Sequence, residues 1–208
     1  RPAMAETDLW ALERACLAEG LTRVCGCDEG GAGPLAGPVY AAAVILPFGL
    51  ELPGLDDSKK LTEKKREALF PLIQERALAW AVARVESREI DETDILSARM
   101  KAMQLAIDGL GLTPALALLD GNRDHGRSAA VTTPHRTVVK GDSLSASIAA
   151  ASILAKVSRD RYMTEEAAAL YPQYEFGRHK GYGTRRHYEL LRQYGPCPIH
   201  RRTFLKNL

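Results

Sequence analysis

The order of the expected strands and helices constrains the fold of this chain more than any other feature. Residues 22–29 alternate between apolar and polar side chains, and residues 37–47 form a more fully buried apolar run after a glycine- and proline-rich stretch. This arrangement predicts a hairpin of two strands. Strands and helices alternate after residue 60, so the sheet should contain both antiparallel and parallel pairs, with helices around it. The pattern therefore predicts an α/β fold with a mixed sheet.

The remaining elements follow from periodicity and from glycine and proline positions. Helices are expected over residues 6–20, 62–79, 90–110 and from Ser143 to about Leu170, and further strands over residues 80–86, 114–120 and 136–140. Pro71 is expected to kink or shorten the second helix, and Gly109 or Gly111 to end the third. There is no repeat, low-complexity tract or linker. Residues 1–208 are therefore expected to form one domain, with residues 171–208 as a basic helical C-terminal extension.

The composition, with 46% hydrophobic and 26% charged residues, is typical of a soluble protein. No apolar run approaches the roughly 20 residues that span a bilayer, and the N-terminus has no signal pattern. The four cysteines lack zinc-finger spacing and are interpreted as small buried hydrophobes in a reducing compartment. These features predict a cytoplasmic protein.

Positive charge is unevenly distributed along the chain. Residues 175–208 contain eight Lys and Arg against two Glu, a net charge of +6, whereas the whole chain carries only +2. A second basic cluster, comprising Lys59, Lys60, Lys64, Lys65 and Arg66, lies within "DSKKLTEKKREAL". Such runs are commonly just solvated faces. Together with a separate acidic centre, they indicate a polyanion lying across the molecule.

Acidic residues lie where the expected strands end. Asp28 and Asp120 each close a strand, Glu29 follows Asp28, and Asp142 comes directly after a third strand. Each has a structural alternative: Asp142 could cap a helix, Asp120 could form a turn with Gly121, and Asp28 and Glu29 could be exposed turn acids. If the strands are neighbours in the sheet, the acids converge on one site.

Carboxylates clustered without His or Cys at ligand spacing favour the hard cations Mg²⁺ or Mn²⁺. Within "GCDEGGAGPLAGPV", two acids come directly before glycines whose backbone can approach a phosphate. A metal ion held by the acids would explain this combination, because it neutralises the phosphate. Adjacent strand residues point to opposite faces, so Asp28 and Glu29 can share a metal site only if the chain bends locally. The glycines after Glu29 permit such a bend.

Seven blocks of sequence carry a specific resemblance. In chain order they are "DEGGAGPLAGPV", "LDDSKKLTEKKREAL", "EIDETDIL", "DGN", "KGDSLSASIAAASILAKVSRD", "HKGYGT" and "HRRTF". They extend from about Val24 to Phe204, and their order resembles that of bacterial ribonuclease HII, the type 2 ribonucleases H. The resemblance implies a ribonuclease H-like fold, with a mixed five-stranded sheet flanked by helices and a helical C-terminal part that helps to hold the duplex.

The resemblance also implies an activity and a set of site residues. The family cuts RNA within RNA–DNA hybrids and on the 5′ side of single ribonucleotides in duplex DNA, leaving 3′-hydroxyl and 5′-phosphate ends. Matched by motif, its four catalytic, metal-binding acids correspond to Asp28, Glu29, Asp120 and Asp142, with Mg²⁺ or Mn²⁺ as cofactor and two ions during catalysis. Further positions would contact the substrate: Gly31, Ala32 and Gly33 in the glycine loop, Ser58, Lys59, Lys60 and Arg123 along the backbone track, and Tyr182 on the sugar.

One residue of the glycine loop differs from the family pattern. The family pattern Gly-Arg-Gly reads Gly31-Ala32-Gly33 here, so a positive charge near the nucleic acid is missing. The tail with which archaeal members of the family bind a sliding clamp is not evident, and a monomer is expected. His179 and His187 flank Tyr182 at a spacing unsuited to metal binding, which favours packing or backbone contacts. A different nuclease of the same fold, which would ignore the 2′-hydroxyl, and a nucleic-acid-binding protein without catalysis remain alternatives.

Overall fold

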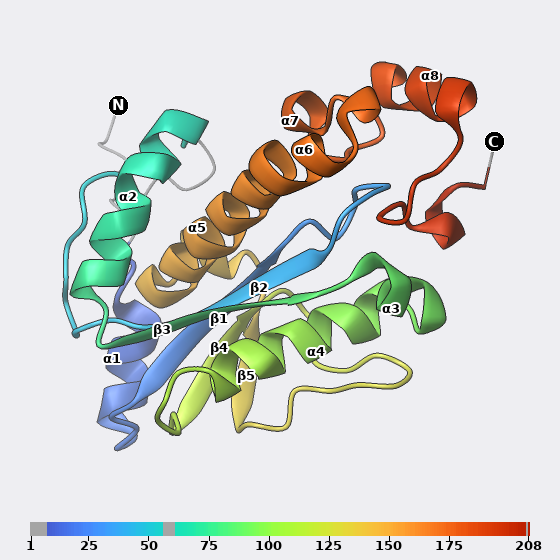
Figure 1. The fold of residues 1–208 in the computed structure, drawn as a ribbon. Helices are drawn as coiled ribbons and strands as arrows, with labels where there is room; N and C mark the ends of the chain where they lie inside the picture. Colours follow the sequence, from blue (N-terminus) through green and yellow to red (C-terminus); the bar gives the residue numbers. More distant parts are fainter. Residues whose placement is uncertain (1–7, 56–60, 207) are drawn as a thin grey trace, which may run out of the picture.

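A five-stranded mixed sheet forms the centre of the molecule (Figure 1). The computed structural model describes residues 8–55, 61–206 and 208. The strands are β1 (Val24–Gly30), β2 (Val39–Ile45), β3 (Ala79–Val85), β4 (Leu116–Asp120) and β5 (His135–Val138), in the spatial order β3-β2-β1-β4-β5. Strand β1 pairs antiparallel with β2 and parallel with β4, while β2–β3 is antiparallel and β4–β5 parallel. The expected α/β fold with a mixed sheet is confirmed.

Helices cover both faces of this sheet. The α-helices of the described residues are α1 (Ala11–Ala18), α2 (Glu63–Arg76), α3 (Ser87–Glu92), α4 (Ile95–Asp108), α5 (Ala146–Arg161), α6 (Ala168–Leu170), α7 (Phe176–His179) and α8 (Arg185–Tyr194). Helix α5 packs on one face, with α2 beside it, and α4 packs on the other face (Figure 1). Each face has its own apolar core, with Ala149 and Ile153 among the residues of one and Met100 and Met103 among those of the other.

Helix α5 lies unusually close to β1, because both elements present small residues to each other. A Cβ atom on Gly26 would lie 2.2 Å from the carbonyl carbon of Ser147 in α5. No larger residue fits at position 26 unless the helix moves away. The alanine-rich sequence of α5 thus permits a close approach, and Gly26 makes it possible from the side of the strand.

The helix predicted over residues 90–110 is wrong as a single element. The chain forms α3 and α4 there, separated at Thr93 and Asp94. Asp94 is extended, with φ −164° and ψ 163°, and its carboxylate accepts the backbone N–H of Ser97 at 2.8 Å. Asp94 therefore caps a new helix instead of continuing the old one. Gly109 ends α4, as expected.

Two other helix boundaries differ from their predictions. The helix expected to start at Ser143 begins at Ala146, after a short 3₁₀ turn (Gly141–Ser143), and passes through a π-helical segment (Tyr162–Ala167) before α6. Helix α2 runs past Pro71 and ends at Arg76. Pro71 therefore does not break the helix, which nevertheless ends before the predicted residue 79.

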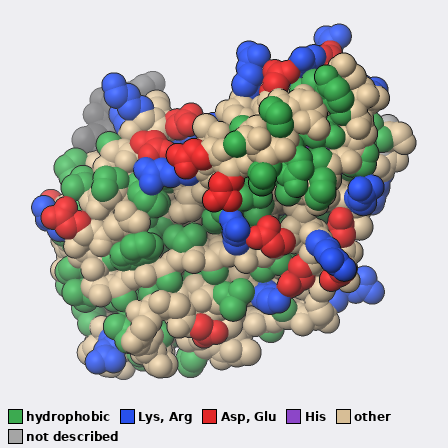
Figure 2. All heavy atoms as spheres, in the orientation of Figure 1, with side chains coloured by type: hydrophobic (Ala, Val, Ile, Leu, Met, Phe, Trp, Pro, Cys, Tyr) green, Lys and Arg blue, Asp and Glu red, His purple; other side chains and the backbone are tan. Residues whose placement is uncertain are grey.

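The C-terminal helices α7 and α8 pack at the far end of α5 around an apolar cluster that includes Tyr174, Phe176 and Leu190 (Figure 1). On the outside, Arg and Glu side chains alternate, as Figure 2 shows for this end of the molecule. Glu175 forms ion pairs with Arg178 at 3.3 Å and Arg186 at 2.7 Å. The helical extension is confirmed, but part of its positive charge is paired internally. Within the described residues, no helix is long and apolar enough to cross a membrane.

Candidate active site

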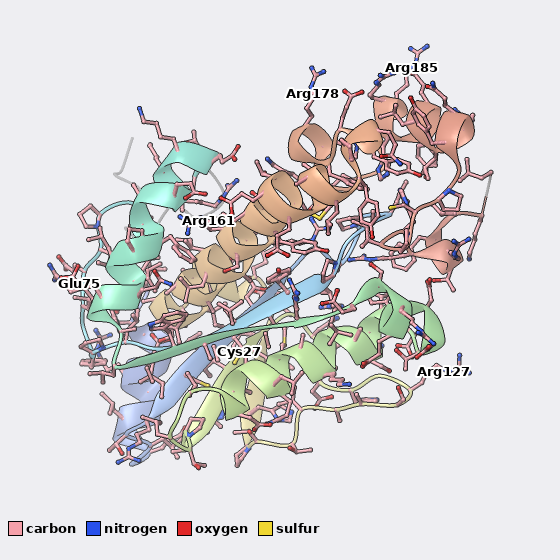
Figure 3. The ribbon with its side chains drawn as sticks, in the orientation of Figure 1. Cys27, Glu75, Arg127, Arg161, Arg178 and Arg185 are labelled. Carbon is pink, nitrogen blue, oxygen red and sulfur yellow. The ribbon has the colours of Figure 1, made fainter. Side chains whose placement is uncertain are left out.

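Two aspartates meet at the carboxyl ends of neighbouring parallel strands. The register of β1 and β4 pairs Cys27 with Leu119, which brings Asp28 and Asp120 next to each other. Figure 3 labels Cys27, the residue that directly precedes Asp28. Leu118 packs with Ile148 of α5, and alternate residues share a face, so Asp120 faces α5. Asp28 shares that face, because Gly26, two residues earlier, contacts α5.

Asp142 joins this pair through its backbone. It lies in the 3₁₀ turn after β5, and its N–H donates to Oδ1 of Asp120 at 3.2 Å. The alternative that Asp142 caps the following helix is wrong, because the hydroxyl of Ser145 accepts the N–H of Ile148 at 3.2 Å and caps α5. The turn therefore places Asp142 beside the end of β4.

Glu29 lies on the other face of the sheet. Its Oε1 is 2.8 Å from Nη2 of Arg99 in α4, while its Oε2 is buried and has no hydrogen-bond partner. The expectation that Asp28 and Glu29 point to opposite faces is met in this conformation. Among the described residues, no three His, Cys, Asp or Glu side chains are arranged to hold a metal ion together.

Burial and mutual repulsion raise the pKa values of these acids. Asp28 is only 5% exposed, and its burial, followed by the charges of Glu29 and Asp120, raises its pKa well above the usual range. Burial also raises the pKa of Glu29, an effect that Arg99 opposes. Burial, and then the charge of Asp142, raise the pKa of Asp120 against the backbone hydrogen bond from Asp142.

This environment fits a hard divalent cation. Buried carboxylates that repel one another are stabilised when a cation lies between them, and oxygen ligands are those that Mg²⁺ and Mn²⁺ prefer. The unpartnered Oε2 of Glu29 is a further oxygen that could serve. Asp28 and Asp120 would hold the ion from one face, with Asp142 beside them. Glu29 would have to turn away from Arg99 to join them.

Two buried arginines, Arg159 and Arg201, donate hydrogen bonds to backbone carbonyl groups of the glycine-rich segment that follows β1. Arg201 donates to the carbonyl oxygens of Gly31, Ala32, Pro34 and Gly37 at 2.6–2.9 Å. It is fully buried, and its burial and the neighbouring Arg159 lower its pKa to about 9. These bonds fix the direction of the loop's carbonyl groups.

Arg159 of α5 connects the loop to the segment that contains Tyr182. It donates to the carbonyl oxygens of Ala36, Pro38 and Lys180 at 2.7–3.0 Å. Its guanidinium carbon also lies 5.6 Å from the centre of the Tyr182 ring. In addition, the Leu35 N–H donates to the carbonyl of Gly181 at 2.9 Å. The glycine loop and Tyr182 are thus parts of one hydrogen-bonded assembly.

The same assembly leaves the Tyr182 ring accessible. The residue is 46% exposed, although its neighbour Gly181 is buried with φ +89°. A Cβ atom on Gly181 would lie 2.4 Å from the carbonyl oxygen of Ala36, so only glycine permits this contact. Tyr182 therefore presents an aromatic surface beside the loop that follows the acidic strand.

Comparison with known proteins identifies the family. Residues 25–207 match the family model of ribonuclease HII. This chain belongs to the ribonuclease HII family. A ribonuclease HII of Caldicellulosiruptor saccharolyticus is 48% identical over 203 residues, which cover 98% of this chain and 97% of that protein. Ribonuclease HII is a type 2 ribonuclease H, so the chain is an endoribonuclease that acts on RNA–DNA hybrids.

Solved structures agree with this assignment. The crystal structure of the ribonuclease H2 from Pyrococcus horikoshii OT3 aligns with a TM-score of 0.69 and 29% identity, covering 88% of this chain and 93% of that chain. The structure of Bst-RNase HIII in complex with Mn²⁺ shares the fold, with a TM-score of 0.59 and 18% identity over 94% of this chain and 69% of that chain. The ribonuclease H-like fold is confirmed.

The structure places most, but not all, of the expected ribonuclease HII site residues. Asp28, Asp120 and Asp142 lie at one edge of the sheet, the glycine loop continues from β1, and Tyr182 lies beside that loop. Arg123 is exposed in the loop that follows β4, three residues after Asp120. Ser58, Lys59 and Lys60 lie outside the described residues.

Arg159 and Arg201 are the residues whose roles the sequence analysis missed. Arg201 was counted only within the basic C-terminal tract, although its side chain is completely buried. Both arginines occur inside blocks typical of ribonuclease HII, "KVSRD" and "HRRTF". An arginine within a specific motif, rather than in a run of charges, is the signal that could have set them apart.

Proposed function

We propose that this ribonuclease HII cuts RNA–DNA hybrids and also cuts duplex DNA on the 5′ side of a single embedded ribonucleotide. The products would carry a 3′-hydroxyl and a 5′-phosphate, and the activity would serve the removal of ribonucleotides from DNA. The observation that carries the proposal is the adjacent pair of buried Asp28 and half-buried Asp120, beside a glycine loop that is hydrogen-bonded to the segment of Tyr182.

Divalent metal belongs to this proposal. Asp28 and Asp120 would hold Mg²⁺ or Mn²⁺, with Asp142 and, after rotation, Glu29 completing the set. Two such ions, when bound, can activate a water molecule and stabilise the leaving oxygen of a phosphodiester. The Mn²⁺ complex of Bst-RNase HIII, which has the same fold, supports metal dependence in this architecture.

The chain's own groups would select and orient the ribonucleotide. Gly31, Ala32 and Gly33 bring backbone close to the substrate, and Arg201 keeps two of their carbonyls turned inward. The ring of Tyr182 would pack on the sugar next to the cleaved bond, as an exposed aromatic surface can. Arg123, with Ser58, Lys59 and Lys60, would contact the phosphate backbone.

Ala32 would weaken this activity without changing its selectivity. Its carbonyl is bonded to Arg201, so the backbone of the loop is held whatever side chain position 32 carries. An arginine there would add a charge-assisted hydrogen bond to the nucleic acid, which alanine does not provide. We propose that the enzyme still chooses ribonucleotides but turns over slowly.

Three duplexes of one sequence test the proposed function: a DNA duplex with one ribonucleotide, an RNA–DNA hybrid and an all-DNA duplex. Each is incubated with the protein in Mg²⁺, in Mn²⁺ and in EDTA, and the ends are mapped on a sequencing gel. We expect cleavage of the first two substrates only, with metal only, and 5′ of the single ribonucleotide. Cleavage of the all-DNA duplex would favour another nuclease of this fold, and binding without cleavage would favour a binding protein.

A further inference from the structure

Three histidines form a buried cluster behind Tyr182. His179 ends α7, His187 lies in α8, and His200 lies in the segment that follows α8; they are 8%, 0% and 2% exposed. The rings of His179 and His187 stack with their centres 4.1 Å apart, and those of His187 and His200 are 5.1 Å apart. None of the hydrogen-bond partners of these rings is one of the acids of the candidate active site.

Hydrogen-bond partners determine the proton positions in a chain from His200 to Tyr182. The backbone N–H of Cys197 donates to Nδ1 of His200 at 2.9 Å, so the proton of neutral His200 is on Nε2. That Nε2 lies 2.8 Å from Nε2 of His187, which must then accept. His187 consequently carries its proton on Nδ1, which donates to the carbonyl oxygen of Tyr182 at 2.8 Å.

His179 satisfies the adjoining backbone in the same manner. Its Nδ1 accepts the N–H of Gly181 at 3.0 Å, so its proton is on Nε2, which donates to the carbonyl of Tyr174 at 2.7 Å. Every ring nitrogen of the three histidines thus has a partner, and all three rings must be neutral. A second proton on His187 or His200 would place two N–H groups against each other.

Burial supports the neutral state. Burial lowers the pKa of His187 to about 4, with His179 adding to the effect, and burial, followed by His187 and His179, lowers that of His200 to about 3. The pKa of His179 is lowered by burial as well. At neutral pH, His200 therefore donates to His187, and His187 donates to the carbonyl of Tyr182.

This chain ends on a segment without regular secondary structure. Residues 182–184 belong to no helix or strand, yet the ring of Tyr182 must keep one orientation to pack on a sugar. The N–H of Tyr182 donates to the carbonyl of His179, and its carbonyl accepts from Nδ1 of His187 and from the N–H of Thr184, both at 2.8 Å. Both backbone groups of Tyr182 are thus held by the histidine cluster or by its backbone.

We propose that His187, oriented by His200, is a positioning residue for Tyr182 and so contributes to cleavage at single ribonucleotides. The inference rests on the proposed function, since it requires that the Tyr182 ring contacts the substrate. His187 is fully buried, so it has no surface for substrate or metal and acts through the carbonyl of Tyr182.

A double-mutant cycle with Tyr182→Ala tests the proposal. In the wild-type background, His187→Phe should lower kcat/KM on the single-ribonucleotide duplex about three- to tenfold, the range that one net hydrogen bond supports. In the Tyr182→Ala background, the same change should have no further effect, because the group being positioned is gone. Equal losses in both backgrounds, with Tyr182→Ala itself impaired, would overturn the positioning role alone. An unimpaired Tyr182→Ala would overturn the role of Tyr182 as well.

Two amide variants keep the test decisive if His187→Phe does not fold. The amide nitrogen of Asn is as many bonds from Cα as Nδ1 of His, whereas that of Gln corresponds to Nε2. His187→Asn should therefore retain the donor to Tyr182 and most of the activity, and His187→Gln should not. Equal activity of the two variants would contradict the proposal. His135→Gln, at the start of β5, is the matched control and should cleave like wild type.

A readout independent of activity is the ¹⁵N spectrum of the wild-type histidines at pH 7. We expect His187 with its proton on Nδ1, and His200 and His179 with theirs on Nε2. A His187 proton on Nε2 would remove the donor to Tyr182 and overturn the proposal.

Discussion

Polar groups are buried both at the acidic end of β1 and β4 and around Tyr182. The two regions differ in whether all of these groups have hydrogen-bond partners. At the acidic end, Asp28 is buried and Glu29 and Asp120 are partly buried; the three carboxylates repel one another, and Oε2 of Glu29 has no hydrogen-bond partner. Around Tyr182, every ring nitrogen of His179, His187 and His200 is hydrogen-bonded and neutral.

This difference separates two tasks. A site that binds a cation gains from carboxylates that destabilise one another until the cation arrives. A surface that recognises a sugar gains from a side chain that is already oriented, because less conformational freedom is lost on binding. Negative charges that repel one another are thus concentrated where metal is proposed to bind. Around Tyr182, where the sugar is proposed to be recognised, the buried polar groups are neutral and hydrogen-bonded.

Removing one charge at the acidic end should have the largest effect. Asp120→Asn should reduce cleavage in Mg²⁺ more than about a hundredfold, beyond the 10–100-fold typical of residues that only support metal ligands. Because repulsion is relieved, Tm should rise by about 2–4 °C for each kcal/mol gained in a chain of this length. Gel-based kinetics and calorimetry measure the two effects. Asp108→Asn, an exposed residue in α4, is the control, and an active Asp120→Asn would rule out the acidic site.

Truncating the aromatic surface comes next. Tyr182→Ala should lower kcat/KM at an isolated ribonucleotide by about five- to 150-fold, the equivalent of the roughly 1–3 kcal/mol that stacking contributes. The midpoint of urea unfolding should change little, since the ring is half exposed. Tyr194→Ala, in α8 with 50% exposure, should retain activity. Unfolding of Tyr182→Ala together with equal losses on every substrate would mean that Tyr182 is only structural.

Restoring the missing charge in the glycine loop should have a smaller effect, and in the opposite direction. Ala32→Arg should raise turnover at least severalfold, because a solvent-exposed arginine realises only part of the roughly 1.5–3 kcal/mol that a hydrogen bond to a charged group contributes. The cut position should not change, since the backbone of the loop is held by Arg201. Ala32→Gln has a long side chain without charge and serves as the control. If Ala32→Arg gains nothing, the loop acts through its backbone alone.

The smallest expected effect concerns the pH dependence of stability around Tyr182. The pKa of His187 is about 4 in the folded protein, against roughly 6.5 for an unfolded histidine. Between these values the unfolded chain takes up a proton that the folded protein does not, so stability falls as pH falls from 6.5 towards 4. His187→Asn should lessen that fall by up to about 1.4 kcal/mol per pH unit, measured by urea unfolding.

His135→Asn provides a control of opposite sign. Asp124 raises the pKa of His135 in spite of burial, so His135 adds stability below its unfolded pKa and loses it as pH rises through its folded value. Removing His135 should therefore make the loss of stability at low pH steeper. Identical pH profiles for the wild type and His187→Asn would show that His187 is not held neutral.

Local signals predicted most of the architecture but not its boundaries. Alternation in β1 and the apolar run of β2 predicted adjacent strands that the structure confirms. The helix expected over residues 90–110 is interrupted near its start, at Asp94, whose backbone is extended and whose carboxylate caps α4. Asp142 and Ser145 are both good capping residues, and local sequence did not show which of them caps α5.

The sequence by itself determined the family, the mixed α/β fold and the acids at the strand ends, because each depends on residue type, order and local periodicity. Only the tertiary structure decided that Glu29 pairs with Arg99 of α4, that Arg201 lies buried beneath the glycine loop, and that His200 and His187 form one directed chain to Tyr182. These contacts join residues far apart along the chain. For Arg201 and His187 the partners are backbone carbonyl groups, which every residue possesses, so the pattern of side chains does not specify those contacts.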